Sequence, residues 1–321
     1  KDIHVVVHGF TSSWRWPGGL TSHAPDMFNP TRVAAWRKAK HVKASASDIL
    51  SIYPVLAYFL RTCRALSDGR CELQISAFLL MAEMVDAFLL VPFGATTPEA
   101  VQLKVRSFLR ACVAADWEEY MKPKFHWLVH LVGHLLCFAL ERKHKVPKKH
   151  AREMKNTRVF EEAVLGEVTC EHLCVLEDPE FGSSRVGLLD KHAAPVALAQ
   201  YLCDSEPWLQ NMAGLTNDDF KAGHQSRHGL HGVSRKGDIV LLNNGGAWAC
   251  GEVRAHLEIA DEPVTLVSLF DPIVFSAERR FAKWAPRDNN LQLWPTSDIR
   301  CACVYRRYTD CVVTLLPPYV R

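Results

Sequence analysis

The sequence has 321 residues, a hydrophobic share of 48% and nine Trp, which exclude a disordered chain and leave room for about two domains. The formal net charge is only +3, so the chain as a whole is not strongly basic and any affinity for nucleic acid must come from local clusters. The 11 cysteines are odd in number and widely spread, and no signal peptide precedes them, which favours reduced thiols over a disulfide framework.

The chain begins at Lys1 within an apolar run, which indicates a fragment or a processed product. Residues 3–10 are β-branched and apolar and predict a short buried strand, or the passage from a strand into a helix. The loop that follows ends at residue 30, and Asp26 or Asn29 is expected to cap the next element. That element is a helix-forming stretch with a basic surface, for which a solvated helix face is the alternative: Arg32, Arg37, Lys38, Lys40, His41 and Lys43.

Residues 47–120 show a helical pattern that predicts a bundle of helical hairpins. Ser47 or Asp48 is expected to cap its first helix. The segment 72–90 is apolar on nearly all sides and is expected in the middle of the bundle; because it contains Glu83 and Asp86, no membrane span is predicted. A further helix is expected to begin with Thr97 as the cap and Pro98 in the first turn.

The central stretch runs from residue 122 to residue 158 and combines a histidine pair, an acid and a run of cations. His126 and His130 are four residues apart and share one face of a helix, and Glu141 stands where an apolar segment gives way to a basic one. These cations predict contact with nucleic-acid phosphates, and a solvated helix face is again the alternative: Arg142, Lys143, Lys145, Lys148, Lys149, Arg152, Lys155 and Arg158.

Residues 160–176 predict an amphipathic helix that carries Cys170 and Cys174. These thiols could bind zinc with His126 or His130, but buried core cysteines are the favoured interpretation. Residues 177–187 and 205–232 are rich in Gly, Pro, Asp, Asn and Ser and predict a boundary near residue 230. Three histidines of this segment suggest a solvated loop rather than a metal site: His224, His228 and His231.

The last 85 or so residues change to a strand pattern. Strands are expected at residues 237–242, 248–253, 264–270, 273–275, 291–294, 299–305 and 311–316, which together predict a small SH3-like barrel or sandwich. Its opening, around Gly237 and Asp238, resembles barrels of chromatin-associated proteins that begin with a Lys-x-Gly-Asp-x-Val strand. Trp248, Trp284 and Trp294 are either a recognition surface or core residues.

The strings KPKFHWLVHL, CFALERKHK and NTRVFEEAVLGEVTCEHL resemble the last third of a divergent DDE-type transposase of the CACTA kind, over residues 1 to about 180. The resemblance implies a ribonuclease H-like core in which Glu141 is the third catalytic acid. Alignment of His4 with the histidine of the family's Asp-x-Met-His motif puts Lys1 where the second acid belongs. Asp2 replaces that acid only if the register slips by one residue, and a surface aspartate is the alternative.

The resemblance implies an α+β fold, with a partial ribonuclease H-like core, an all-helical insertion and a small C-terminal β-barrel. The expected parts are residues 1–45 for the first piece of the core, 46–120 for the insertion, and 121–200 for the return of the core with Glu141 and the basic helix. Residues 201–231 are then expected as a linker and 232–321 as the barrel.

Transposases of this kind hold two Mg²⁺ ions between at least three carboxylates to cut and join DNA strands. Glu141 and Asp2 are the candidate catalytic and metal-binding acids here, and the first acid would lie before Lys1. We therefore predict a nuclear, transposase-derived DNA-binding protein that is inactive as this chain, with homo-oligomerisation open and zinc not expected. A domesticated chromatin or nucleic-acid interaction protein is the alternative. A metal-dependent hydrolase built on His126, His130 and Glu141 is disfavoured, because the acid lies outside the histidine pair.

Overall fold

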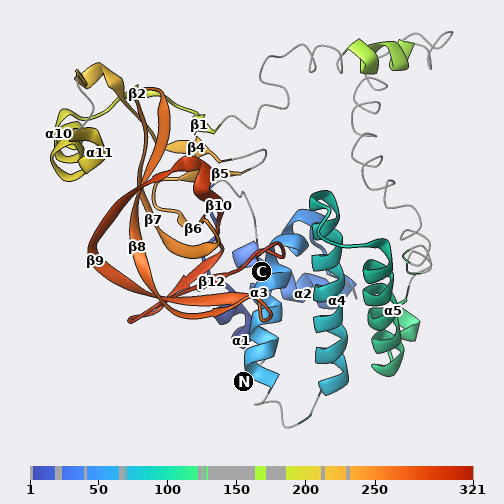
Figure 1. Cartoon of the computed structure of the whole chain (residues 1–321). Helices are drawn as coiled ribbons and strands as arrows, with labels where there is room; N and C mark the ends of the chain where they lie inside the picture. The colour runs from blue at the N-terminus through green and yellow to red at the C-terminus, as the bar shows by residue number, and fades with distance from the viewer. Residues whose placement is uncertain are drawn as a thin grey trace. The chain divides into compact units, whose positions relative to one another are not determined.

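The computed structural model describes residues 3–18, 24–39, 42–64, 71–121, 163–170, 186–210, 214–228 and 232–320, together with residues 69, 125 and 128. It contains helices and antiparallel sheets, which confirms the predicted α+β class (Figure 1). The chain divides into two compact units: Lys1–Arg61 together with Ser184–Arg321, and Thr62–Ser183. The first unit is therefore assembled from both ends of the sequence, and the second is inserted between them.

The first unit begins with helices rather than with the predicted strand. Its first elements are α1 (Ile3–Thr11), the 3₁₀ turn η1 (Ala24–Asp26), α2 (Pro30–Ala39) and α3 (Ala46–Cys63). Of the two alternatives predicted for residues 3–10, the short buried strand is wrong: the segment is helical and its β-branched Val5 and Val6 are exposed. Phe10 stacks against Tyr58 and lies 4.8 Å, between ring centroids, from Phe59, so the end of α1 is held by α3.

Asparagine and serine side chains cap α2 and α3. Asn29 Oδ1 accepts hydrogen bonds from the backbone N–H groups of Thr31 at 2.9 Å and Arg32 at 3.1 Å, as predicted for this position. For α3 the capping residue is Ser45 rather than Ser47 or Asp48. The Asp48 N–H donates to Ser45 Oγ at 3.1 Å, and the Ser45 N–H donates to Asp48 Oδ2 at 3.4 Å, which forms a reciprocal capping box.

A large antiparallel sheet forms the body of the first unit. Its strands are β6 (Ile239–Asn244), β7 (Ala247–Ile259), β8 (Glu262–Ser276), β9 (Phe281–Pro295), β10 (Ile299–Ala302), β11 (Tyr305–Arg307) and β12 (Val312–Leu315). They lie in the order β10-β6-β7-β8-β9-β12-β11, and the 3₁₀ turn η7 (Thr296–Asp298) separates β9 from β10. All seven predicted strand segments fall mainly within these strands, while no closed barrel is found among the described residues.

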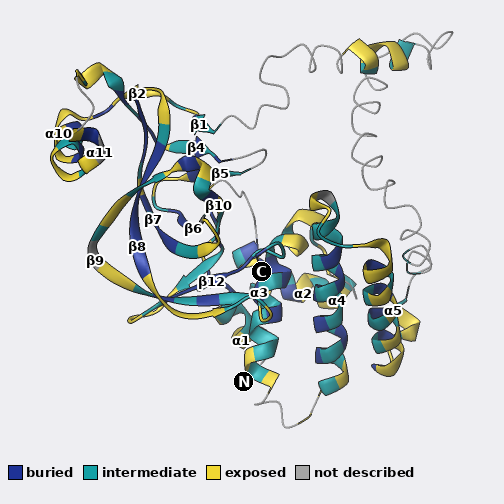
Figure 2. Cartoon of the chain, in the orientation of Figure 1, coloured by how far each residue is buried: buried dark blue, intermediate teal, exposed yellow. Residues whose placement is uncertain are grey.

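The two faces of β6 are both buried (Figure 2). Ile239 and Leu241 face a cluster that includes Phe270 and Trp284, whereas Val240 and Leu242 face a second cluster that includes Val253, Val267 and Ile299. Alternate residues of a strand point to opposite faces, so the uninterrupted apolar run 239–242 serves both cores. This double burial places β6 at the centre of the unit.

The N-terminal helices pack on the C-terminal end of this sheet. Trp14, Ile52 and Val55 lie in one buried cluster with Val313 and Leu315 of β12. A backbone bridge adds to it: the Arg15 N–H donates to the Tyr305 carbonyl at 2.7 Å, and the Tyr305 N–H donates to the Arg15 carbonyl at 3.0 Å. Segments at opposite ends of the chain therefore share one core.

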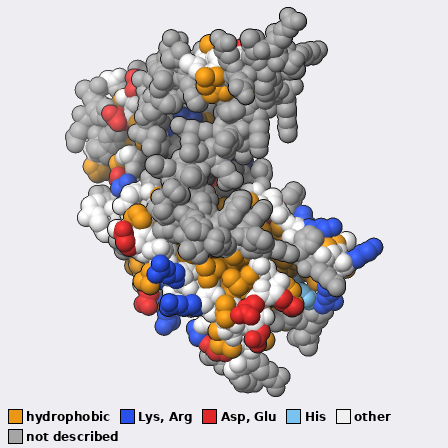
Figure 3. Space-filling model, turned by 90° about the vertical axis from the view of Figure 1, so that its right-hand side faces the viewer, with side chains coloured by type: hydrophobic (Ala, Val, Ile, Leu, Met, Phe, Trp, Pro, Cys, Tyr) orange, Lys and Arg blue, Asp and Glu red, His pale blue; other side chains and the backbone are white. Residues whose placement is uncertain are grey.

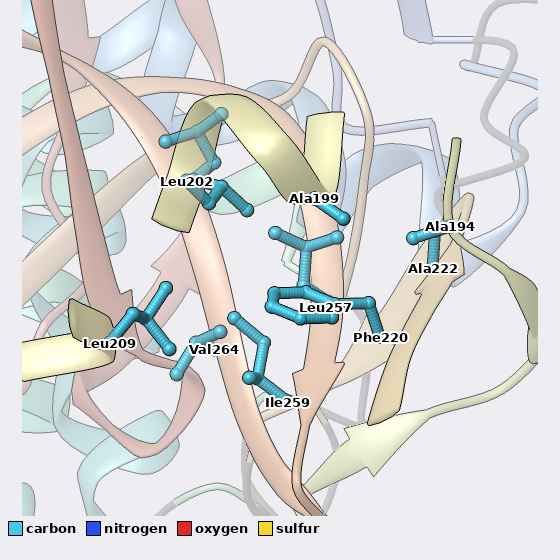
Figure 4. Close-up of a cluster of buried hydrophobic side chains, with 10 residues drawn as sticks. Ala194, Ala199, Leu202, Leu209, Phe220, Ala222, Leu257, Ile259 and Val264 are labelled. Atoms are coloured by element: carbon cyan, nitrogen blue, oxygen red, sulfur yellow. The ribbon is translucent and has the colours of Figure 1, made fainter. Parts of the chain in front are cut away.

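The segment predicted as a linker supplies core elements. It contains part of α10 (Val196–Ser205), α11 (Pro207–Gln210), the 3₁₀ turn η6 (Asn217–Asp219), β3 (Phe220–Gly223) and β4 (Gln225–Arg227). β3 pairs with β7 and with β2 (His192–Ala193), and β4 lies between β1 (Gly187–Leu188) and β5 (Val233–Arg235) in a small second sheet. Figure 4 shows Ala199, Leu202 and Leu209 of the two helices directed toward Leu257 and Val264 of the large sheet. The strands β3 and β4 are only four and three residues long, so many residues of the segment 201–231 lie in the turns that connect them, and this explains its turn-like composition.

The second unit contains a helical hairpin, as predicted. α4 (Glu72–Leu90), the 3₁₀ turn η3 (Val91–Phe93), α5 (Pro98–Ala114) and the 3₁₀ turn η4 (Glu118–Tyr120) follow one another, and residues 163–170 are also helical. Thr97 Oγ1 accepts the Ala100 N–H at 3.3 Å, so the predicted cap of α5 is confirmed. Lys104 on α5 forms an ion pair with Glu83 on α4 at 2.6 Å. α4 is the one described helix whose length and composition would allow it to cross a membrane.

Candidate nucleic-acid interface

Apart from Phe125 and Leu128, the central stretch of the sequence lies outside the described residues. The predicted acids, the histidine pair and the phosphate-binding run all lie outside them: Asp2, Glu141, His126, His130, Arg142, Lys143, Lys145, Lys148, Lys149, Arg152, Lys155 and Arg158. His4 is described and lies on α1, where it is partly buried. The strand on which the transposase resemblance puts the second acid is thus a helix over its described part.

The predicted basic surface before α3 is present on α2. Residues 30–43 contain five Lys or Arg and no Asp or Glu. Arg37, Lys38 and Lys43 are exposed and Arg32 is partly buried, while Lys40 and His41 lie outside the described residues. We call Arg32, Arg37, Lys38 and Lys43 the α2 basic surface.

Aromatic packing fixes the opposite side of α2. Val33 is 4% exposed, and the ring of Trp36 meets that of Phe28 edge-on with 5.7 Å between centroids. Trp36 Nε1 donates to the Lys43 carbonyl at 3.3 Å, so the chain after the helix folds back along it. Helical periodicity puts Lys38 opposite the side of Val33 and Trp36, while Arg32 and Arg37 flank that side.

Three arginines of the large sheet contact protein groups that can be named. Arg307 and Arg254 both pair with Glu252, at 2.8 Å and 3.3 Å. Burial lowers the pKa of Arg307, but the hydrogen bond and charge of Glu252 outweigh it and produce a net rise. The guanidinium of Arg306 lies 4.5 Å from the ring centroid of Tyr308 and 5.3 Å from that of Phe10. These arginines stabilise the fold, and the α2 basic surface is the better candidate for binding a polyanion.

Two of the three histidines predicted in a solvated loop can be placed. His224 is exposed, but His228 is 6% exposed and neither ring nitrogen has a hydrogen-bond partner among the described residues. Burial lowers the pKa of His228, so the neutral imidazole is favoured. The prediction of a solvated loop is wrong for His228, which directly follows β4, is buried, and donates its N–H to the Gly232 carbonyl at 2.8 Å. His231 lies outside the described residues.

A buried polar network near His228 was not predicted from the sequence. His256 is fully buried on β7 and lies 3.0 Å, through Nδ1, from Thr265 Oγ1, which lies 2.9 Å from Thr296 Oγ1. Within the described ranges no group of three or more His, Cys, Asp or Glu residues is arranged to hold a metal ion. Cys170 is exposed, and Cys174 lies outside those ranges, so the zinc hypothesis for this pair is not tested.

The three tryptophans proposed as a recognition surface have different environments. Trp284 is 1% exposed and its Nε1 donates to Thr314 Oγ1 at 2.8 Å, so it is a core residue. Trp248 and Trp294 are partly buried and pack against separate clusters. A recognition surface that includes Trp284 is therefore contradicted.

Searches of protein-family models, of curated proteins and of solved structures find no match to this chain. The evidence for function therefore comes from the residues themselves, and above all from the α2 basic surface.

Proposed function

We propose that this chain is a transposase-derived DNA-binding protein, a remnant of a metal-dependent strand-transfer enzyme that has no catalytic activity as this chain. The observation that carries the DNA-binding part is the α2 basic surface, whose segment has five cations and no carboxylate. When such a cluster binds DNA, counterions are released from the phosphate backbone, and this release makes the binding free energy more favourable even for a chain whose net charge is only +3. A nuclear location and the absence of a membrane partner belong to the same proposal.

Helix α1 supports the loss of catalysis. In the transposase resemblance the second acid belongs to a strand that lies beside the other acids of a ribonuclease H-like core, but residues 3–11 are helical. Two Mg²⁺ ions require several converging carboxylates, and Glu141 alone cannot hold both. In our proposal Glu141 is an inherited residue and the cations retain the DNA contact.

For the large sheet we propose an SH3-like architecture. Strands β6 to β9 follow one another as antiparallel neighbours, η7 comes next, and β10 returns to pair with β6. This order motivates the second candidate function, a chromatin or nucleic-acid interaction protein without catalysis, as a fold-level analogy alone.

DNA binding can be tested by fluorescence anisotropy with a labelled duplex at several salt concentrations. The variant Arg37→Glu/Lys38→Glu is expected to weaken binding at least tenfold, and to reduce the slope of log K against log salt by about 2, since each phosphate contact contributes about 0.9. The control Arg279→Glu/Arg300→Glu has the same change in net charge at exposed residues of the sheet and is expected to bind like the wild type.

Equal affinity of the two double variants would contradict a role for α2. Salt-independent binding, or no binding, by the wild-type chain would contradict the whole DNA-binding proposal. Incubation with Mg²⁺ and a nicked duplex tests the catalytic part: we expect no cleavage. Cleavage that disappears in Glu141→Gln would show that the catalytic site has survived.

A further inference from the structure

A shallow depression of about 400 Å³ lies where the β3–β4 connection meets the end of β5. It is lined by His224, Gln225, Arg235 and Lys236. Two positive side chains, an imidazole and an amide therefore converge from segments that are adjacent in space but separated in sequence. This is the composition of an anion site, since three of the four residues can donate hydrogen bonds and carry or acquire a positive charge.

Asp190 fixes the backbone on one side of the depression. Its carboxylate accepts the N–H groups of His224 and Gln225, both at 3.1 Å. Burial raises the pKa of Asp190, but these two N–H donors and the nearby histidines outweigh it and lower the pKa overall, so the carboxylate stays ionised. Gly223 permits the close approach, because a Cβ there would lie 2.9 Å from Asp190 Oδ1. The Lys236 N–H then donates to the His224 carbonyl at 2.9 Å and joins the two sides.

Asp238 fixes the other side. It is 7% exposed and accepts the backbone N–H groups of Arg235 at 2.8 Å and Gly18 at 2.9 Å. A Cβ on Gly18 would lie 2.9 Å from Arg235 Cδ, so the stem of Arg235 runs along the bare backbone of this loop. The position of Arg235 is therefore set by buried contacts from a distant part of the chain.

Among the described residues, none forms an ion pair with Arg235 or Lys236. Both side chains are exposed, and neither forms a hydrogen bond with another described residue. Other cations of the same unit are paired: Lys191 and Lys221 share Glu258, as Arg254 and Arg307 share Glu252. Two uncompensated cations on an ordered backbone are a preformed site for an oxyanion, since the guanidinium matches two oxygens and the ammonium acts as a point charge.

We propose that this depression binds one phosphate group, with Arg235 and Lys236 supplying the charge and His224 and Gln225 donating further hydrogen bonds. Its volume exceeds that of inorganic phosphate, so a phosphate attached to a sugar also fits. The group comes either from a nucleic-acid backbone or from a small phosphorylated molecule. The inference does not rest on the DNA-binding proposal, because the site is separate from the α2 basic surface.

The test is a titration of the full chain with inorganic phosphate, followed through the ring-proton NMR signal of His224, with sodium chloride at matched ionic strength as the reference. A saturable shift is expected with phosphate and not with chloride. It is expected to be lost in Arg235→Gln/Lys236→Gln and kept in Arg279→Gln/Arg300→Gln, which removes the same charge elsewhere. Circular dichroism of each variant checks that the fold is retained.

A second experiment, with duplex DNA, distinguishes a nucleic-acid phosphate from that of a small phosphorylated molecule. If the phosphate belongs to nucleic acid, Arg235→Gln/Lys236→Gln lowers the salt slope of DNA binding by about 1 to 2. A phosphate response with an unchanged slope, or with no DNA binding at all, supports a small phosphorylated ligand. If chloride produces the same shift as phosphate, or if the titration and the slope both remain unaffected by the double variant, the proposal is overturned.

Discussion

His256 of β7 and Thr265 of β8 lie 3.0 Å apart, Nδ1 to Oγ1, in the fully buried interior of the first unit. Burial lowers the pKa of His256 from 6.5 to about 4, with His228 acting in the same direction. The unfolded chain therefore binds a proton that the folded chain does not, and stability falls as the pH drops from about 6.5 toward 4, by about 3 kcal/mol from this residue.

This pH dependence can be measured by urea unfolding of the wild type and His256→Asn between pH 7 and pH 4.5. The asparagine amide can keep a hydrogen bond to Thr265 but cannot be protonated, so the variant is expected to lose less stability over this range. His192→Asn, at an exposed histidine, is the control and should behave like the wild type. Parallel curves for the wild type and His256→Asn would contradict the assignment.

Trp284 and Thr314 form a buried hydrogen bond across β9 and β12. Trp284→Phe leaves the Thr314 hydroxyl without this donor and opens space in the core, so we expect a loss of about 2 to 4 kcal/mol in the free energy of unfolding. A double-mutant cycle with Thr314→Val isolates the bond itself, for which about 1 kcal/mol of coupling is expected. A coupling energy near zero would show that packing alone explains the effect.

Gly251 and Gly9 provide a matched pair of glycine substitutions. A Cβ on Gly251 would lie 2.5 Å from both the Ser268 carbonyl oxygen and Val267 Cγ1, so Gly251→Ala is expected to destabilise the sheet by about 1 to 3 kcal/mol or more. Gly9 lies in α1 with open space around it, and Gly9→Ala is expected to stabilise by up to about 1 kcal/mol. Thermal unfolding separates the two, and equal melting temperatures would contradict the packing at Gly251.

Loss of the Asn29 cap is expected to destabilise α2 locally. Asn29→Ala removes the acceptor for two backbone N–H groups and is expected to cost about 1 kcal/mol. Because α2 carries the basic surface, its amides should exchange faster with solvent while those of β7 remain protected. Ser47→Ala serves as the control for α2, since the Ser47 hydroxyl lies 2.8 Å from that of Ser45 at the cap of α3, and exchange along α2 is expected to stay unchanged. Unchanged exchange rates along α2 in Asn29→Ala would exclude Asn29 as its cap.

Local signals explain the elements that the sequence predicted correctly. Thr97 and Pro98 mark the start of α5, and the turn between β6 and β7 is made by Gly245 and Gly246, whose φ angles are 61° and 98°. Glycine adopts such angles without steric cost, so consecutive glycines between apolar runs predict a hairpin. In these cases the residues that decide the structure lie within a few positions of one another.

The incorrect predictions concern residues whose partners are distant in sequence. Phe10 becomes helical beside Tyr58 and Phe59, and Asp238 binds the backbone of Gly18, 220 positions away. The depression beside His224 and Arg235 was not predicted either, because these residues become neighbours through the pairing of β4 with β5, which aligns Gln225 with Arg235. The transposase resemblance pointed to residues 122–158, whereas the described basic surface is the one on α2, which the sequence marked as a second cluster.

The shared core of Trp14 with Val313 and Leu315 determines when the first unit can mature during translation. Roughly 300 residues separate these partners, which at ribosomal speeds of about 5 to 20 residues per second means a delay of about 15 to 60 seconds. Over that interval α1 and α3 can pack on each other but lack their partners in β12, while the intervening hairpin of α4 and α5 can already pair. Chaperone demand should therefore be concentrated on helices α1 to α3.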